Sequence, residues 1–485
     1  MAYEAVIGLE CHIQLRTRSK MFCGCPVEFG AGPNSNTCPV CLGLPGALPV
    51  ANRAAVDAAL RLGLALGSSI GTTSVFARKH YFYPDMPKNY QITQYDRPLC
   101  EGGALPVVVD GIARTFALTR IHCEEDTGKS FHPERHGDRR ISRVDFNRAG
   151  VPLLELVTEP VLHTPAECAA FLTALRRLVR ALGISGGDME KGQLRCDANV
   201  SLRPAGTTGL GTKTEIKNLN SIKGVEKGVT AEIARQGRCL ETGEPIVQAT
   251  LLFDADHDKL AVMRTKEQAH DYRYFPDPDL PLLRVAEARV GAVRASLPEL
   301  PWAREERFRS QYGLPAYDAE VLSDPPELAD YFEACAEGID AKLASNWLMT
   351  EVLRVLRERG WSLEAWSRQW PAPRLRELLA SVAARELPGP IAKQVFGWMC
   401  DEPGPLTEVL ARHAVKVQGS ADELLPLVYQ VLEENAAAVA EYLAGKSQTF
   451  GFLVGQVMKK SGGQAVPQTV QELLRRELAG RVAKD

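Results

Sequence analysis

The residue pattern of this 485-residue chain changes near position 293, and this change limits the folds that it can adopt. Before it, many glycines accompany short segments that alternate apolar and polar residues, a pattern typical of strands. After it, apolar residues recur at helical spacing, as in residues 341–360 and 373–384, and all six tryptophans lie between Trp302 and Trp398. Strands followed by helices predict an α+β chain with separate sheet and helical regions.

The length suggests about three domains, and the charge pattern supplies a second division. Residues 401–440 hold seven acidic and two basic residues, whereas residues 441–485 hold seven basic and four acidic residues. We therefore predict domains at 1–293, 294–409 and 410–485, with Pro467 opening the last helix. The basic tail has two interpretations, a solvated helix face or a surface for nucleic-acid phosphates.

The overall charge and the apolar runs exclude several classes of protein. With 57 basic and 60 acidic residues the net charge is −3, so any nucleic-acid contact must be a local patch. The N-terminus lacks the basic region of a signal peptide, and no apolar run reaches the ~18 residues of a membrane span. We expect a cytoplasmic protein without membrane contact, whose twelve cysteines are thiols or metal ligands.

Four of the cysteines form two close pairs, Cys23 with Cys25 and Cys38 with Cys41, and twelve residues lie between the pairs. The loop between them is rich in Gly, Pro and Asn. Paired thiols at such spacing predict a tetrahedral zinc site. Four thiolates leave zinc no open position, so the predicted role is structural. The alternative is four ordinary buried thiols.

Charged residues share one face of several predicted strands. Glu10 and His12 alternate with the apolar residues of the first strand, and a segment from Thr119 ends in His122, Glu124, Glu125 and Asp126. Two further faces consist of Arg195, Asp197, Asn199 and Ser201, and of Lys213, Glu215 and Lys217. These are either the wet faces of half-buried strands or a site where a divalent ion bridges phosphates.

Several common catalytic motifs are missing. Gly128 and Gly445 each begin a Gly-Lys-Ser tripeptide, but the earlier glycine of a phosphate-binding loop is replaced by Cys123 and Ala440. The sequence also has no kinase signature and no G-x-S-x-G elbow. If the chain uses ATP, an uncommon fold binds it, and acyl hydrolysis by this chain is not supported.

Longer strings of residues resemble one family across essentially the whole chain. They are Val6–His12, Pro33–Thr37, Lys79–Ile92, Arg120–Ser130, Asp145–Glu155, Arg195–Pro204, Asp271–Pro276 and Gly455–Lys459. The sequence resembles the B subunit of the bacterial glutamyl/aspartyl-tRNA amidotransferase. This resemblance implies a cradle domain on a mostly antiparallel sheet, then a helical domain and a small helical tail that contact tRNA.

The resemblance also implies the reaction. ATP phosphorylates the side-chain carboxylate of Glu-tRNA(Gln) or Asp-tRNA(Asn), and ammonia then displaces phosphate to give the amide. The ammonia comes from the amidase (A) subunit, so the implied assembly is a heterotrimer that also contains the small (C) subunit. ATP and Mg²⁺ are the implied cofactors, beside structural zinc.

The site residues implied by the resemblance coincide with the polar strand faces. The implied magnesium ligands are Glu10, His12 and Glu125, with Asp197 and Glu215 as a second set. Alternation alone leaves Glu124 and Glu125 equally open, and only the resemblance selects Glu125. The implied catalytic residues are Lys88, Glu125 and Arg195, and those expected near ATP phosphates are Lys213 and Arg273.

Overall fold

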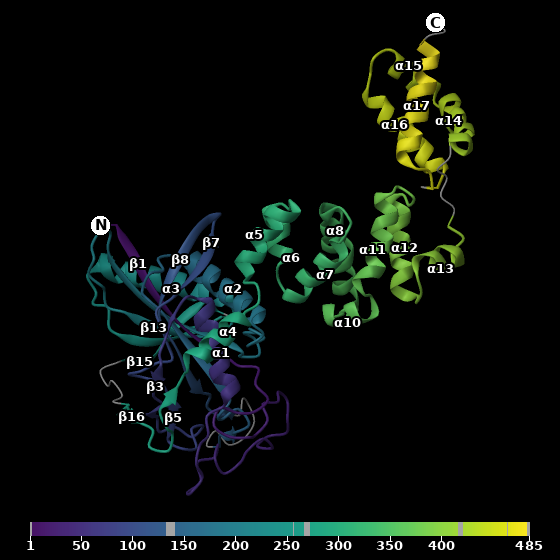
Figure 1. Ribbon diagram of the computed structural model, residues 1–485. Helices are drawn as coiled ribbons and strands as arrows, with labels where there is room; N and C mark the ends of the chain where they lie inside the picture. Colours follow the sequence, from purple (N-terminus) through teal and green to yellow (C-terminus); the bar gives the residue numbers. More distant parts are fainter. Residues whose placement is uncertain are drawn as a thin grey trace. The chain divides into compact units, whose positions relative to one another are not determined.

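The computed structural model describes residues 2–131, 141–255, 257–265, 272–415, 421–462 and 464–482. The chain divides into two compact units, Met1–Ala303 and Arg304–Asp485 (Figure 1). The first unit combines sheets with helices and the second is helical. The predicted α+β class is therefore confirmed.

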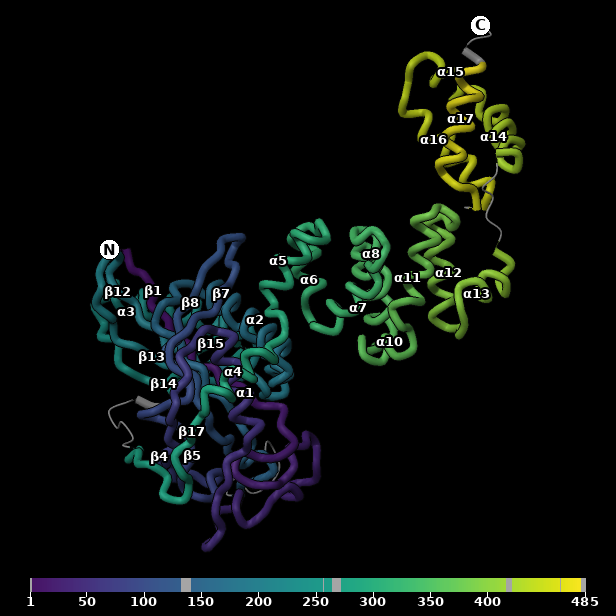
Figure 2. The backbone as a smooth tube through the Cα atoms, viewed as in Figure 1, coloured from purple at the N-terminus to yellow at the C-terminus, as the bar shows by residue number. Residues whose placement is uncertain are grey.

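A ten-stranded sheet is the scaffold of the first unit. Its strands are β1 (Tyr3–Gln14), β2 (Ser69–Ile70), β6 (Cys100–Glu101), β7 (Ala104–Val109), β8 (Ile112–Glu125), β11 (Pro152–Thr158), β12 (Leu194–Pro204), β13 (Thr214–Leu219), β14 (Ala249–Asp254) and β15 (Lys259–Thr265). Their order is β15-β14-β13-β12-β1-β11-β8-β6-β2, and β7 pairs with β8. Only the pair β13–β14 is parallel among these described strands. Figure 2 shows β1 beside strands that come much later in the sequence.

Smaller sheets lie beside this scaffold. They pair β3 (Thr73–Ser74) with β17 (Leu283–Arg284), β9 (Lys129–Phe131) with β10 (Arg143–Asp145), and β4 (Ala77–His80) with both β5 (Tyr90–Thr93) and β16 (Phe275–Pro276). The loop that joins β4 to β5 carries Lys88, so this small sheet brings a candidate residue to the site.

Helices cover the apolar face of the large sheet. The first unit contains α1 (Arg53–Ala65), α2 (Pro165–Ala181), α3 (Ile222–Thr242) and α4 (Glu287–Ala295). Buried residues of α1, α2 and α3 form one cluster with the apolar residues of β1. Local sequence sets the helix ends: Thr164 and Glu167 form a capping box at the start of α2, and Gly243, at φ 76°, ends α3.

The second unit consists of helices. They are α5 (Pro301–Tyr312, which begins in the first unit), α6 (Ala316–Leu322), α7 (Pro326–Ala336), α8 (Ala341–Trp347), the π-helical segment η1 (Leu348–Val352), α9 (Leu353–Arg359), α10 (Leu363–Gln369), α11 (Ala372–Ala383), α12 (Gly389–Asp401), α13 (Leu406–Arg412), α14 (Ala421–Glu434), α15 (Ala436–Leu443), α16 (Gln448–Lys460) and α17 (Pro467–Val482). The helices predicted at 341–360 and 373–384, and the start at Pro467, are confirmed.

Buried side chains form three separate clusters along the chain. They run from Ala5 to Val293, from Phe308 to Val409 and from Leu424 to Leu478. The division into three domains stays a prediction. Each cluster lies within one predicted domain and would form the core of that domain. No helix in the described ranges is long and apolar enough to cross a membrane.

Candidate functional site

A polar face crosses the large sheet on the side opposite α1, α2 and α3. Along β1 the apolar residues are buried, whereas Glu10 and His12 are partly exposed, so the predicted alternation is confirmed. The antiparallel register places Glu10 opposite Asp197 of β12, and His12 opposite Arg195. Two of the predicted faces therefore become one surface, because the strands that carry them are neighbours.

His12 lies at the centre of this face, between two carboxylates. Its Nε2 atom is 3.5 Å from Oε1 of Glu124 and 3.5 Å from Oε2 of Glu155. One ligand atom from each of the three residues lies within 4.8 Å of the others. Two carboxylates suit Mg²⁺ or Mn²⁺, and an imidazole suits a softer ion. This donor set fits a divalent cation.

Burial and neighbouring charges shift the pKa values of this cluster. Burial, followed by the charge of Glu155, raises the pKa of Glu124 to about 7. Burial disfavours the charged form of His12, but the hydrogen bond to Glu155 and the charge of Glu124 raise its pKa to about 9. Burial likewise opposes a cation at Lys79, yet nearby negative charges, that of Glu124 first, raise its pKa. The carboxylates thus favour positive charge at this point.

The structure separates Glu124 from Glu125. Successive residues of a strand point to opposite faces, and only Glu124 reaches His12. The Glu125 carboxylate accepts hydrogen bonds from Lys88 Nζ and, at 2.9 Å, from the backbone N–H of Ile92. The geometry therefore places Glu124 beside His12 and pairs Glu125 with Lys88, while the role of Glu125 as a magnesium ligand stays a prediction.

Glu155 is a candidate that sequence reasoning missed. It lies opposite His12 on one side and opposite His122 on the other, and its Oε2 is 3.6 Å from Nε2 of His122. Burial opposes its charge, but His122 and His12 lower its pKa. Glu155 alternates with buried leucines of β11, which was an available signal, but only the strand order brings it to His12.

A second acidic group lies along the same face. Lys217 Nζ is 2.5 Å from Asp197 Oδ2 and 3.1 Å from Glu215 Oε1. Asn199 donates a 2.9 Å hydrogen bond to Glu10. Burial raises the pKa of Glu10, and the charges of Glu155 and Glu215 raise it further. The predicted second ligand set is thus brought together, with Lys217 partly neutralising it.

The predicted basic residues occupy different places. Arg195 donates a 2.7 Å hydrogen bond to Asp126 Oδ2, beside the His12 cluster. Lys213 lines a cavity of about 250 Å³ together with Glu10, Asn199 and Ser201. Arg273 is exposed, and its backbone carbonyl lies 3.1 Å from Nδ1 of His80. The structure therefore brings Arg195 and Lys213 to the polar face, whereas Arg273 lies beside the small sheet that contains β4.

Lys88 lies in a partly aromatic environment. Its Nζ contacts Glu125 and lies 5.8 Å from the ring centre of Phe22 and 5.6 Å from that of Tyr90. Gly43, just after the second cysteine pair, packs so closely that a Cβ there would lie 2.6 Å from Lys88 Cγ. The loop that carries the cysteines therefore supports Lys88.

The four clustered cysteines converge as the spacing predicted. One sulfur from each of Cys23, Cys25, Cys38 and Cys41 lies within 4.8 Å of the others. A hydrogen bond from Cys23, opposed by burial and aided by the backbone of Cys38, lowers the pKa of Cys41 to about 4. Thiolate character and convergence fit a tetrahedral zinc ion.

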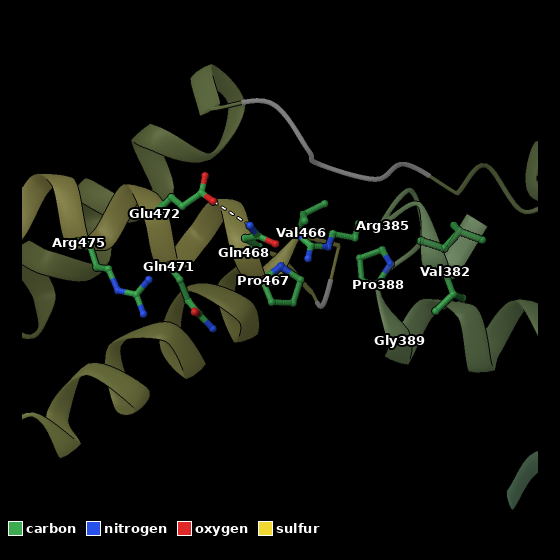
Figure 3. Close-up of a pocket in the computed structure, with 11 residues that line it drawn as sticks. Val382, Arg385, Pro388, Gly389, Val466, Pro467, Gln468, Gln471, Glu472 and Arg475 are labelled. Carbon is green, nitrogen blue, oxygen red and sulfur yellow. Dashed lines mark hydrogen bonds between the residues drawn. The ribbon is translucent and has the colours of Figure 1, made fainter. Parts of the chain in front are cut away.

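A larger cavity, of about 470 Å³, lies in the second unit (Figure 3). It is lined by Val382, Arg385, Leu387, Pro388, Gly389, Val466, Pro467, Gln468, Gln471, Glu472 and Arg475. Gln468 donates a 3.0 Å hydrogen bond to Glu472 within it. None of the predicted catalytic or metal-binding residues lines this cavity, so the candidate site remains on the sheet of the first unit.

Comparison with known proteins gives matches over both units. Residues 5–291 match a family model described as the GatB/GatE catalytic domain, and residues 330–478 match one described as the GatB domain. Two similar proteins are named as the B subunit of aspartyl/glutamyl-tRNA(Asn/Gln) amidotransferase. That of Chlorobium chlorochromatii is 48% identical over 481 residues, and that of Geobacter sulfurreducens is 49% identical over 484; each alignment covers 99% of this chain and 100% of the relative.

Proposed function

Because the chain belongs to the family of aspartyl/glutamyl-tRNA amidotransferase B subunits, we propose that its polar sheet face activates and amidates the side chain of Glu or Asp attached to tRNA. The observation that carries this proposal is the convergence of His12, Glu124 and Glu155, beside Arg195, within the segment that matches the catalytic-domain model.

The chemistry explains why this face is charged. A carboxylate is a poor acyl donor, so its oxygen first attacks the γ-phosphorus of ATP, the bond to ADP breaks, and an acyl phosphate forms. Ammonia then attacks the acyl carbon, and phosphate leaves with the bonding electrons. The attacking carboxylate is already anionic, so the first step requires no general base. Its main requirement is compensation of negative charge.

His12, Glu124 and Glu155 would hold the divalent cation, with Glu10, Asp197 and Glu215 as a second set of oxygen donors. When bound, Mg²⁺ supplies positive charge to the phosphoryl group. Arg195, held by Asp126, would orient phosphate oxygens. Lys213 would contact the nucleotide from the cavity beside Glu10, and Arg273 is an additional, exposed candidate for the phosphates.

Lys88 and Glu125 would act in the second step. Their buried pair lies on the other side of β8 from Glu124, where it would bind the incoming ammonia before the ammonia reaches the acyl phosphate. The sequence has no amidase motif, which supports delivery of ammonia by a separate amidase (A) subunit, with a small (C) subunit in the assembly. The cysteine centre would hold structural zinc and support the loop against Lys88.

The second unit would bind tRNA, and its basic tail supports this role. Lys446, Lys459, Lys460, Arg475 and Arg476 lie in the described part of the tail; the side chain of Arg481 and residue Lys484 lie outside it. We propose the cytoplasm as the place of action. Whether Glu-tRNA(Gln) or Asp-tRNA(Asn) is used depends on the synthetases of the cell.

Release of ADP without an ammonia donor tests the proposal, because the bond to ADP breaks in the first step and phosphate leaves only in the second. The chain is purified with its partner subunits and given ATP, Mg²⁺ and either acylated or uncharged tRNA. We expect release only with acylated tRNA; equal release with uncharged tRNA would overturn the proposal. Glu124→Gln should abolish the release and leave tRNA binding intact. Glu125→Gln, its neighbour on the other face, should keep release but slow the amidation that follows when ammonium is added.

A further inference from the structure

Lys20 is a fully buried lysine beside the cysteine centre. Its side chain is 0% exposed. Its Nζ lies 3.6 Å from Sγ of Cys41 and donates a 3.2 Å hydrogen bond to the backbone carbonyl of Phe146. In the part of the chain that the structure describes, no carboxylate lies within ion-pair distance of Lys20. Neither the chemistry of the polar face nor the predicted zinc ligands accounts for this residue.

A buried ammonium needs a counter-charge. Moving an unpaired ammonium out of water costs several kcal/mol, and one carbonyl oxygen cannot offset that cost. The sulfur of Cys41 is the other acceptor within reach of Nζ among the described residues. A neutral thiol would add little, whereas a thiolate would accept a charge-assisted hydrogen bond. The burial of Lys20 therefore indicates that the cysteine cluster carries negative charge.

Zinc with four thiolates has this charge. A divalent ion bound by four singly charged sulfurs leaves a net charge of −2 on the centre, and one ammonium at Cys41 offsets half of it. We propose that Lys20 is the counter-ion of the metal–thiolate centre, donating an N–H to Cys41 Sγ and thereby retaining the metal. This inference rests on the zinc proposal above.

Lys20 is hydrogen-bonded to both cysteine pairs. Its N–H donates a 2.9 Å hydrogen bond to the carbonyl of Cys25, while its side chain reaches Cys41 of the other pair. The anchoring carbonyl of Phe146 belongs to a segment that the cysteine loop also holds. Asn34 N donates to Asp145 Oδ1 at 2.9 Å, and Asn36 N donates to Asn147 Oδ1 at 2.8 Å. Lys20 thus bridges the two cysteine pairs and ties them to this segment.

Metal retention and metal spectroscopy test the inference in the full chain. Lys20→Met keeps the length of the side chain and removes the charge, whereas Lys20→Arg keeps the charge. The control is Lys223→Met, the same substitution at an exposed lysine of α3 outside the cysteine centre. We expect one zinc per wild-type chain. Lys20→Met should bind zinc about 10–100-fold more weakly, the usual cost of losing an outer partner of a metal ligand, and should release it to a chelator correspondingly faster. Lys20→Arg should largely restore retention, and Lys223→Met should match wild type.

The cobalt-substituted protein gives a readout independent of activity. Removing the N–H donor raises the energy of the sulfur lone pairs, so the thiolate-to-cobalt band should move to longer wavelength in Lys20→Met. Wild-type release rates and an unchanged band in folded Lys20→Met would overturn the role of Lys20. If Lys20→Met does not fold, release of zinc from folded Lys20→Arg about 10–100-fold faster than from wild type would overturn it. A wild-type chain without zinc would instead overturn the zinc proposal.

Discussion

Gln236 of α3 holds together the two strands that carry the second acidic group. It is 0% exposed. Its Oε1 accepts a 3.1 Å hydrogen bond from Leu202 N, and its Nε2 donates at 3.0 Å to the carbonyl of Val200, both on β12. The same Nε2 donates at 3.0 Å to Thr214 Oγ1 of β13 and at 2.8 Å to Glu232 Oε1. We predict that Gln236→Leu destabilises the first unit and leaves the second unaffected.

The expected loss of stability depends on which buried groups lose their hydrogen bond to Gln236. Gln236→Leu leaves the Leu202 N–H without its side-chain acceptor, and a buried unsatisfied group costs about 1–3 kcal/mol. Val200 O also loses its side-chain donor, because the one hydroxyl hydrogen of Thr214 goes to Glu232 at 2.6 Å. Glu232 keeps this bond and that of Arg235 at 2.7 Å, so these further losses add about 1 kcal/mol. The total is about 3 kcal/mol. At about 2.1 cal/mol/K per residue of unfolding entropy, a unit of about 300 residues loses about 5 °C in Tm.

The tryptophan distribution provides an internal control. Five of the six tryptophans, Trp347, Trp361, Trp366, Trp370 and Trp398, lie in the second unit, and only Trp302 lies in the first. Calorimetry would follow the unfolding of both units, whereas tryptophan fluorescence would report mainly the unfolding of the helical second unit. Glu226→Leu, at an exposed position of α3, is the matched variant and should leave both transitions in place. A first-unit Tm within about 1 °C of wild type, or an equal fall in the fluorescence transition, would refute the reasoning.

Three further predictions address charge and packing. Lys217→Met should leave Asp197 and Glu215 repelling each other, so the Tm of the first unit should fall. Added Mg²⁺ should then raise the Tm of this variant by more than it raises the Tm of wild type. Equal rises in the two proteins, measured by calorimetry, would contradict the prediction. Trp366→Ala, at a fully buried site, should cost the second unit about 3–5 kcal/mol, visible as a lower helical melting transition by circular dichroism while the first unit is unchanged. Lys459→Gln, on the exposed end of α16, should reduce the magnitude of the salt-dependence slope of tRNA binding by about one; titrations at several salt concentrations with an unchanged slope would exclude a phosphate contact.

The sequence was sufficient for features that depend on local pattern. Period-two alternation placed Glu10 and His12 on one face of β1, and the structure confirms it. Paired spacing brought the four cysteines together as a candidate site, because a short loop closes at small entropic cost. Pro467 similarly marked the start of a helix. In each case the relevant contacts lie within one element or one loop.

The choice between Glu124 and Glu125 required the strand order. Alternation predicts that these neighbours face opposite sides, but it does not say which side His12 occupies. That depends on β11 lying between β1 and β8, which also brings Glu155 to His12. The burial of Lys20 could not be predicted from the sequence either, since lysine side chains are ordinarily exposed.

The sequence by itself therefore determined the α+β class, the faces of the strands, the cysteine cluster and the family to which the chain is similar. Only the tertiary structure decided which carboxylates lie beside His12, which lysine meets Glu125, and which lysine faces the Cys41 sulfur. The physical reason is that side-chain direction is set by the local backbone, whereas a binding site is set by pairing between strands more than one hundred residues apart.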